Sequence, residues 1–269
     1  MKKYLALILA LAMSCSLLTA CGGGEEPAPA EDTAEETALV YAVEAGSAGE
    51  AVAAENGFEY NSVASQADAL MEVASGTSDA AIIDLLMAGA MIGEGTSYPN
   101  LKYTDKLSTE EYGVGCRQGS DLVDVINAVF SATYADGSMQ EIAKKYGVQE
   151  SLCEQPAGLT WEAAADGDVA AIQAAGKLVV GITEFAPMDY LDENNEWIGF
   201  DADMARLVAE ELGVDIEFVV IDWDMKINEV NAKNIDCVWN GMTLTAEVTA
   251  AMDCSAAYCN NAQVVVVAK

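Results

Sequence analysis

Acidic side chains dominate the residues that could do chemistry in this chain. Its 269 residues include 44 Asp and Glu, 12 Lys and Arg, 7 Cys and no His, which gives a formal net charge of −32. The lack of histidine excludes a Ser-His-Asp triad, a Cys-His dyad and a histidine-ligated zinc site. No Cys-x-x-Cys pair occurs and no acidic cluster has the spacing of a calcium loop, so we expect neither a metal nor a cofactor. The negative charge also argues against nucleic acid as a partner.

Three residues that could contact a small molecule lie at the ends of predicted strands. Asp84 ends the apolar segment 79–84 and precedes a predicted helix, where an aspartate is most simply interpreted as the helix N-cap. Phe185 and Trp223 follow predicted strands, and aromatic residues at such positions are by themselves typical of a hydrophobic core. These residues therefore indicate a binding site only when a further observation supports one.

The positions of these residues depend on short strands and helices that alternate from residue 38 onward. Hydrophobic periodicity and capping residues such as Ser65 indicate the alternation. We predict strands over 38–43, 79–84, 100–105, 112–117, 177–182, 216–221, 235–239 and 263–268. We predict helices starting near residue 49, over 65–74, 85–92, 121–134, 138–146, 201–212 and 225–232, and a further helix within 161–175. This alternation predicts an α/β fold with helices on both faces of parallel sheets.

The first residues are interpreted as an export signal. Lys2 and Lys3 precede an apolar stretch over 4–20, which predicts a signal peptide over 1–20; a transmembrane anchor is the alternative, although the stretch is short for one. The ending Leu-Thr-Ala-Cys resembles a bacterial lipobox, which implies removal of the signal and lipidation of Cys21. Residues 21–37 then form a lipidated acidic tether. We expect an extracytoplasmic protein that is lipid-anchored to the outer face of the cytoplasmic membrane.

Several stretches resemble a known family, but in the reverse order. Stretches within 177–187, 199–204, 222–224 and 240–245 are similar to the opening domain of polar amino-acid binding proteins of ABC importers, the bacterial extracellular solute-binding proteins of family 3. Stretches within 45–50, 78–84, 111–115 and 135–138 resemble the portion that normally follows that domain. The resemblance implies a two-lobed, type II periplasmic-binding-protein-like α/β fold that is circularly permuted.

The resemblance also implies a domain arrangement. Lobe two of the binding fold is expected over 38–112 and lobe one over 113–269, with 147–176 as the permutation linker. The chain is expected to cross between the lobes once, near residue 113, and the final strand is expected to end at the hinge. A ligand would bind in the cleft between the lobes.

The resemblance implies a set of ligand-binding residues and two departures from the family. Asp84 corresponds to the residue that binds the ligand ammonium. The other matching positions are two aromatic residues around the ligand and polar or backbone groups: Phe185, Trp223, Asn240, Gly241, Thr243 and Ser47. Val248 stands where family members carry a carboxylate-binding arginine, and Ala48 stands in place of a threonine. Lys226 and Arg117 are possible substitute cations, but we interpret both as surface residues.

These expectations describe the solute-binding subunit of an ABC importer, which captures an amino acid or a related small polar solute. Its partners would be that ligand, the transporter permease and the membrane through the lipid anchor, and we expect a monomer without catalytic residues. The alternatives are a dehydratase or another enzyme on the same scaffold, with Asp84 or Glu184 in acid–base roles, and a sensory lipoprotein without a transport role. The acidity of the chain favours cationic solutes. Among Cys116, Cys153, Cys237, Cys254 and Cys259, the first choice for a disulfide is Cys254 with Cys259.

Overall fold

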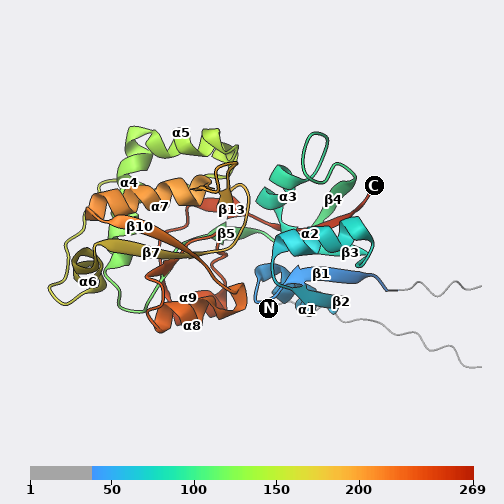
Figure 1. Ribbon diagram of the computed structural model, residues 1–269, viewed down its shortest axis with the longest axis horizontal. Coiled ribbons are helices and arrows are strands. Elements are labelled where there is room, and N and C mark those ends of the chain that lie inside the picture. Colours follow the sequence, from blue (N-terminus) through green and yellow to red (C-terminus); the bar gives the residue numbers. More distant parts are fainter. Residues whose placement is uncertain (1–37) are drawn as a thin grey trace, which may run out of the picture. The chain divides into compact units, whose positions relative to one another are not determined.

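Helices and strands alternate throughout the computed structural model, which describes residues 38–269 (Figure 1). The predicted signal peptide, the lipidation site Cys21 and the tether lie outside the described residues. Within the described part of the chain, no helix combines the length and the apolar character needed to cross a membrane.

Lobe two is built on a mixed five-stranded sheet with the order β2-β1-β3-β14-β4. Strand β14 runs antiparallel to β3 and β4, whereas β1 runs parallel to β2 and β3. The elements of this lobe are β1 (Val40–Glu44), α1 (Ala48–Asn56), β2 (Glu59–Val63), α2 (Gln66–Ser75), β3 (Ala80–Asp84), α3 (Leu85–Met91), β4 (Leu101–Lys106) and β14 (Gln263–Ala268).

Lobe one repeats this arrangement with the order β10-β7-β11-β6-β12. In each sheet the fourth strand, β14 or β6, is antiparallel to its neighbours and lies far in sequence from them. The elements of lobe one are β6 (Gly115–Cys116), α4 (Leu122–Asp136), α5 (Ser138–Lys145), a short 3-10 helix (Gln149–Ser151), α6 (Asp168–Ala175), β7 (Lys177–Ile182), β8 (Tyr190–Leu191), β9 (Trp197–Ile198), α7 (Phe200–Leu212), β10 (Asp215–Val220), a second 3-10 helix (Trp223–Met225), α8 (Lys226–Asn231), β11 (Cys237–Val238), α9 (Ala246–Ala251) and β12 (Asp253–Cys254). This is the two-lobed type II periplasmic-binding-protein fold that the resemblance implied.

Two segments, rather than one, connect the lobes. Strands β5 (Glu110–Tyr112) and β13 (Cys259–Asn261) pair antiparallel, with Tyr112 opposite Cys259. The prediction that residues 113–269 form one lobe is therefore wrong at its end, because β14 lies in the sheet of lobe two between β3 and β4. A short apolar strand fits the interior of either sheet, so its composition does not reveal which one it joins.

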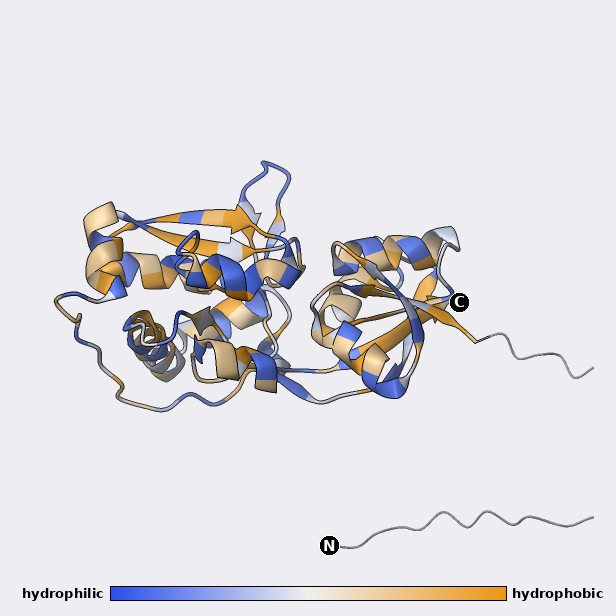
Figure 2. Cartoon of the chain, turned by 90° about the horizontal axis from the view of Figure 1, so that it is seen from below, coloured by the Kyte–Doolittle hydropathy of each residue, from blue (hydrophilic) through white to orange (hydrophobic). Residues whose placement is uncertain are grey.

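Alternating side chains of the central strand β3 are buried against helices on opposite faces of the lobe-two sheet. Ala81 and Ile83 pack in the cluster that contains Leu70 of α2, whereas Ile82 packs with Ala53 of α1. All five residues of β3 are buried, as expected for a strand covered on both faces. In both lobes, Figure 2 shows strands that are mainly hydrophobic and helices of mixed hydropathy.

The ends of the lobe-two sheet bring distant parts of the chain together. In the ladder, Tyr41 of β1 and Val267 of β14 both lie opposite Ala80 of β3. Two strand spacings, about 10 Å, therefore separate the first and the last strand of the described chain.

Several local predictions are confirmed, and others are corrected. Ser65 caps α2 by accepting a hydrogen bond of 3.1 Å from Asp68 N. The helix expected within 161–175 begins only at Asp168. All five cysteines of the described residues are free, so the expected Cys254–Cys259 disulfide is wrong. Cys254 lies in the lobe-one sheet and Cys259 lies in the crossing strand β13, so the two belong to different sheets.

Candidate functional site

A cavity of about 700 Å³ lies between the two lobes. Its walls come largely from the carboxyl ends of the parallel strands β1, β3, β7, β10 and β11 and the turns after them, the edge at which open α/β sheets usually bind ligands. All seven residues expected from the resemblance line this cavity: Ser47, Asp84, Phe185, Trp223, Asn240, Gly241 and Thr243. The structure thus brings together residues from both halves of the chain.

Asp84 lies on the floor of the cavity and accepts hydrogen bonds from several side chains. It accepts a hydrogen bond of 2.6 Å from Tyr112 Oη and one of 3.1 Å from Gln263 Nε2. It also accepts hydrogen bonds from the side-chain amides of Gln66 and Asn261. Asp84 occupies the N-cap position of α3, as its place in the sequence suggested, but its side chain makes no capping bond to the helix. Burial, with a further contribution from the nearby charge of Glu110, raises the pKa of Asp84 to about 7.

Glu44 is a second buried carboxyl group in the cavity, and it was not among the expected residues. It ends β1 as Asp84 ends β3, and it is 3 % exposed. Burial, together with the charge of Asp84, raises the pKa of Glu44 to about 8. A glutamate at the end of a buried apolar strand, one strand away from Asp84, was the sequence signal that could have identified it.

The two aromatic candidates lie in the wall formed by lobe one. Phe185 is 3 % exposed and packs edge-on against Tyr112, with ring centroids 6.3 Å apart. Gly241 has φ +57°, and a Cβ there would lie 2.2 Å from the Phe185 ring, so only glycine permits this approach. Trp223 is 7 % exposed and also lines the cavity. Both aromatic side chains pack against the protein and line the cavity as well.

The remaining polar candidates are engaged in contacts within the protein. Asn240 accepts a hydrogen bond of 3.0 Å from Thr183 N and donates one of 2.6 Å to Thr183 Oγ1. These bonds fix the end of β7. Thr243 donates a hydrogen bond of 3.0 Å to Glu110 Oε2 on β5. Gly241 N donates a hydrogen bond of 2.7 Å to Asp201, and this bond holds the turn after β11 in place. These residues keep the cavity wall in place.

The start of α1 already holds a carboxylate of its own. Ser47 caps the helix by accepting a hydrogen bond of 3.1 Å from Glu50 N. The Glu50 carboxylate accepts a hydrogen bond of 2.7 Å from Gly46 N. These two hydrogen bonds, which resemble a capping box shifted by one residue, occupy backbone donors on either side of Ser47. Ala48 and Val248, the two departures from the family pattern, also line the cavity.

Lys226 is buried in the cavity wall, so its interpretation as a surface residue is wrong. The residue is 7 % exposed. Its Nζ donates a hydrogen bond of 2.8 Å to Gly46 O of lobe two and one of 3.2 Å to Trp223 O. The ammonium lies 4.9 Å from the centre of the Trp223 ring. Burial lowers the pKa of Lys226.

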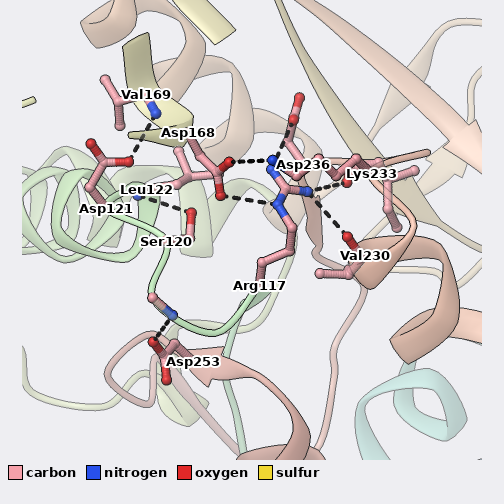
Figure 3. Close-up of polar contacts among 12 residues, drawn as sticks. Arg117, Ser120, Asp121, Leu122, Asp168, Val169, Val230, Lys233, Asp236 and Asp253 are labelled. Atoms are coloured by element: carbon pink, nitrogen blue, oxygen red, sulfur yellow. Dashed lines mark hydrogen bonds and ion pairs between the residues drawn. The ribbon is translucent and has the colours of Figure 1, made fainter. Parts of the chain in front are cut away.

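Arg117 is also buried, but it lies outside the cavity lining and supports lobe one (Figure 3). Its Nε donates a hydrogen bond of 3.0 Å to Asp168, the first residue of α6, and its Nη2 lies 3.5 Å from the carboxylate of Asp236. Its Nη1 donates to the carbonyl oxygens of Val230 and Ile235 at 3.2 and 2.9 Å. Because all of these contacts lie within lobe one, Arg117 is a structural residue, and its interpretation as an exposed cation is wrong.

A family model matches the last third of the chain. Residues 178–269 match the bacterial extracellular solute-binding proteins, family 3. Over this segment, the chain is similar to that family. The match includes β7, β10, β11 and β14 and most of the lobe-one wall of the cavity, with Phe185 and Trp223.

Individual amino-acid-binding proteins are similar over comparable lengths. A probable histidine-binding protein of Neisseria gonorrhoeae is 36% identical over 91 residues, which is 34% of this chain and 34% of that protein. The arginine-binding extracellular protein ArtP of Bacillus subtilis is 32% identical over 83 residues, 30% of this chain and 32% of that protein. The arginine-bound form of truncated ArgBP from T. maritima is 36% identical, covers 30% of this chain and 39% of that chain, and has a TM-score of 0.30. The chain thus spans about a third of the length of the curated relatives that it matches.

The charged residues of the cavity are mostly acidic. Lys226 is the only basic residue that lines it within the described chain. Six carboxyl groups line the same space: Glu44, Glu55, Asp84, Glu110, Glu111 and Glu247. Such a lining favours a ligand with a cationic group, because it attracts positive charge and repels negative charge. Within the described residues, no group of three or more Asp, Glu or Cys side chains is arranged to hold a metal ion.

Proposed function

We propose that this chain is an extracytoplasmic solute-binding subunit of an ABC importer. It captures an amino acid or a related small polar solute with an amine in the cavity between its lobes. The observation that carries this proposal is the cavity itself, which unites all seven expected residues and adds a second buried carboxyl group, Glu44. The similarity to a probable histidine-binding protein and to an arginine-binding protein supports a ligand of this class.

The connection between the lobes supports capture by closure. Only β5 and β13 cross between the lobes in the described chain, and they form a narrow antiparallel pair. Two adjacent crossing strands permit the lobes to bend toward each other without a change in either sheet. Ligand that contacts both lobes would stabilise the closed arrangement, which is the form that a permease could recognise.

Calorimetry with a panel of small solutes tests the proposal. The panel contains arginine, lysine, histidine, glutamine and glutamate, and the decarboxylated amine of each basic amino acid. We expect saturable binding of at least one solute that carries an amine, and no binding of glutamate. Asp84→Asn should weaken that binding, whereas Asp215→Asn, at an exposed position of β10, should leave it unchanged. If no member of the panel binds, the proposal is wrong.

Lipid anchoring at Cys21 is a separate part of the proposal and rests on the lipobox. The diacylglyceryl chains would hold the protein at the outer face of the membrane. Expressed in a bacterium, the wild-type chain should partition into the detergent phase, and Cys21→Ser should remain in the aqueous phase. Equal partitioning of the two chains would rule out the anchor.

We also propose that the order of the family is circularly permuted in this chain, with residues 147–176 as the connector. The family model matches the end of the chain, and Tyr41 and Val267 lie close together across Ala80. A rearranged chain that starts at residue 177, continues to 269 and joins 38–150 through a short linker should fold and bind the same solute. A rearranged chain that is soluble but fails to bind would contradict this arrangement.

A further inference from the structure

Lys226 spans the boundary between the two lobes. It is the first residue of α8 in lobe one, and its ammonium contacts the Gly46 carbonyl of lobe two and the Trp223 carbonyl of its own lobe. An ammonium has three N–H donors. Among the described residues, these two carbonyl groups are its hydrogen-bond acceptors, so one donor is left for a group inside the cavity.

The charge of this ammonium is not neutralised by direct contact. Among residues 38–269, no carboxylate lies within ion-pair distance of Nζ. The carboxyl groups of Glu44, Glu247 and Asp224 act on it from farther away. A buried cation without an ion pair is costly, and a bound anionic group would remove that cost.

The cavity therefore offers groups of both signs to a ligand. The carboxyl groups of Asp84 and Glu110 lie close together, because Gln263 donates to both of them. Lys226 contributes the ammonium, beside Gly46 and the start of α1. A solute with an ammonium and a carboxylate matches this lining, since each of its charges can face a group of opposite charge.

We propose that Lys226 binds the carboxylate of the solute and so selects zwitterionic amino acids over the corresponding amines. This inference rests on the proposed function and assigns the anionic half of the ligand to a particular residue. It also explains how a cavity with Val248 in its wall, and with its α1 donors partly occupied by Glu50, can still hold a carboxylate. The carboxylate would take the free Nζ donor while the contact with Gly46 keeps the lobes together.

Matched ligand pairs test this role by calorimetry. The pairs are arginine with agmatine, lysine with cadaverine and histidine with histamine, which differ by the α-carboxylate. The proteins are wild type, Lys226→Gln, Lys226→Arg and the control Lys177→Gln, whose lysine pairs with Glu217 on the exposed side of lobe one. Binding of the amine also verifies that each variant is folded.

We expect Lys226→Gln to weaken binding of the amino acid about 10- to 100-fold, the loss typical of a charged hydrogen bond. The same variant should bind the amine as tightly as wild type or more tightly, because a repelling charge is gone. Lys226→Arg should restore most of the amino-acid affinity, and Lys177→Gln should resemble wild type. Equal weakening for acid and amine, or no weakening at all, overturns this role for Lys226. A wild-type chain that binds none of the pairs would instead contradict the proposed function.

Discussion

The carboxylate of Asp84, at the end of β3, accepts a hydrogen bond of 2.6 Å from the hydroxyl of Tyr112, on the crossing strand β5. Both residues are buried. This bond joins a residue of the cavity lining to one of the two strands that cross between the lobes. Any ligand that changes the charge of Asp84 therefore acts on the crossing strand directly.

Removal of this hydroxyl should destabilise the protein. Tyr112→Phe leaves Asp84 without one of its donors, and we expect the free energy of unfolding to fall by about 1–2 kcal/mol. Urea unfolding at pH 7 measures the change. The matched control is Tyr103→Phe, because Tyr103 is 46 % exposed and its loss of a hydroxyl should have no effect. Equal stability of the two variants would contradict a structural role for the bond.

The buried carboxyl groups should make the ligand-free protein less stable as the pH rises. The pKa of Glu44 is raised from 4.5 to about 8, so the folded state retains a proton that the unfolded state releases between these pH values. Stability from this group is therefore complete below pH 4.5 and is lost as the pH rises toward 8. Thermal unfolding between pH 5 and 9 should show a falling midpoint.

Glu44→Gln should flatten this pH dependence. The variant has no proton to lose, so its midpoint should exceed that of wild type at pH 8 and approach it at pH 5. Glu59→Gln, at an exposed position of β2, serves as the control and should follow wild type throughout. A steeper slope for Glu44→Gln than for wild type would show that the carboxyl group is charged in the folded state.

Gly46 should be intolerant of a side chain because the lobes touch there. Its φ is +69°, and a Cβ would lie 2.7 Å from Asp224 Cα of the other lobe. Gly57 has the same φ of +69° but nothing within 4 Å of a Cβ, so it is a matched control. Gly57→Ala should cost about 1 kcal/mol of stability from backbone strain alone. Gly46→Ala should in addition weaken ligand binding several-fold, because the lobes can no longer close fully; equal affinity for the two variants would argue against this contact.

Arg117 should matter for stability and not for ligand specificity. Arg117→Gln removes the guanidinium from Asp168 and Asp236, of which Asp168 keeps its weaker pair with Lys233, and we expect a loss of about 3 kcal/mol in the free energy of unfolding. Lys145→Gln, which removes an ion pair from a side chain that is 60% exposed, should cost less than about 1 kcal/mol. Urea unfolding gives both values. A change in the ligand preferred by Arg117→Gln would place this residue in the binding site after all.

Local patterns in the sequence predicted most elements, because each element carries its own signal. The strand over 177–182 and the strand over 263–268 match β7 and β14, and Ser65 begins α2 as its capping chemistry requires. The strand β2 was missed because its exposed edge position leaves it without an apolar run. The sheet to which β14 belongs was also missed, since pairing is a tertiary property that no local pattern contains.

The cavity residues could be named in advance only through the resemblance. Asp84 by itself looked like a helix cap, and Phe185 and Trp223 looked like core residues; each description captures only part of the environment that the structure shows. The burial of Lys226 and Arg117 was not foreseeable, because their partners lie on segments far away in sequence. Long-range contacts of this kind decide whether a lone cation is exposed or buried.

Because Tyr41 and Val267 flank Ala80 in a single sheet, the two ends of the described chain belong to one rigid body. Tension applied between them would load β1, β3 and β14 and would bypass lobe one until that sheet separates. For the same reason, the distance between these ends should stay constant during the lobe closure proposed above. Fluorescent labels at the two ends would therefore be blind to ligand capture, whereas one label on α4 and one on α2 would report it.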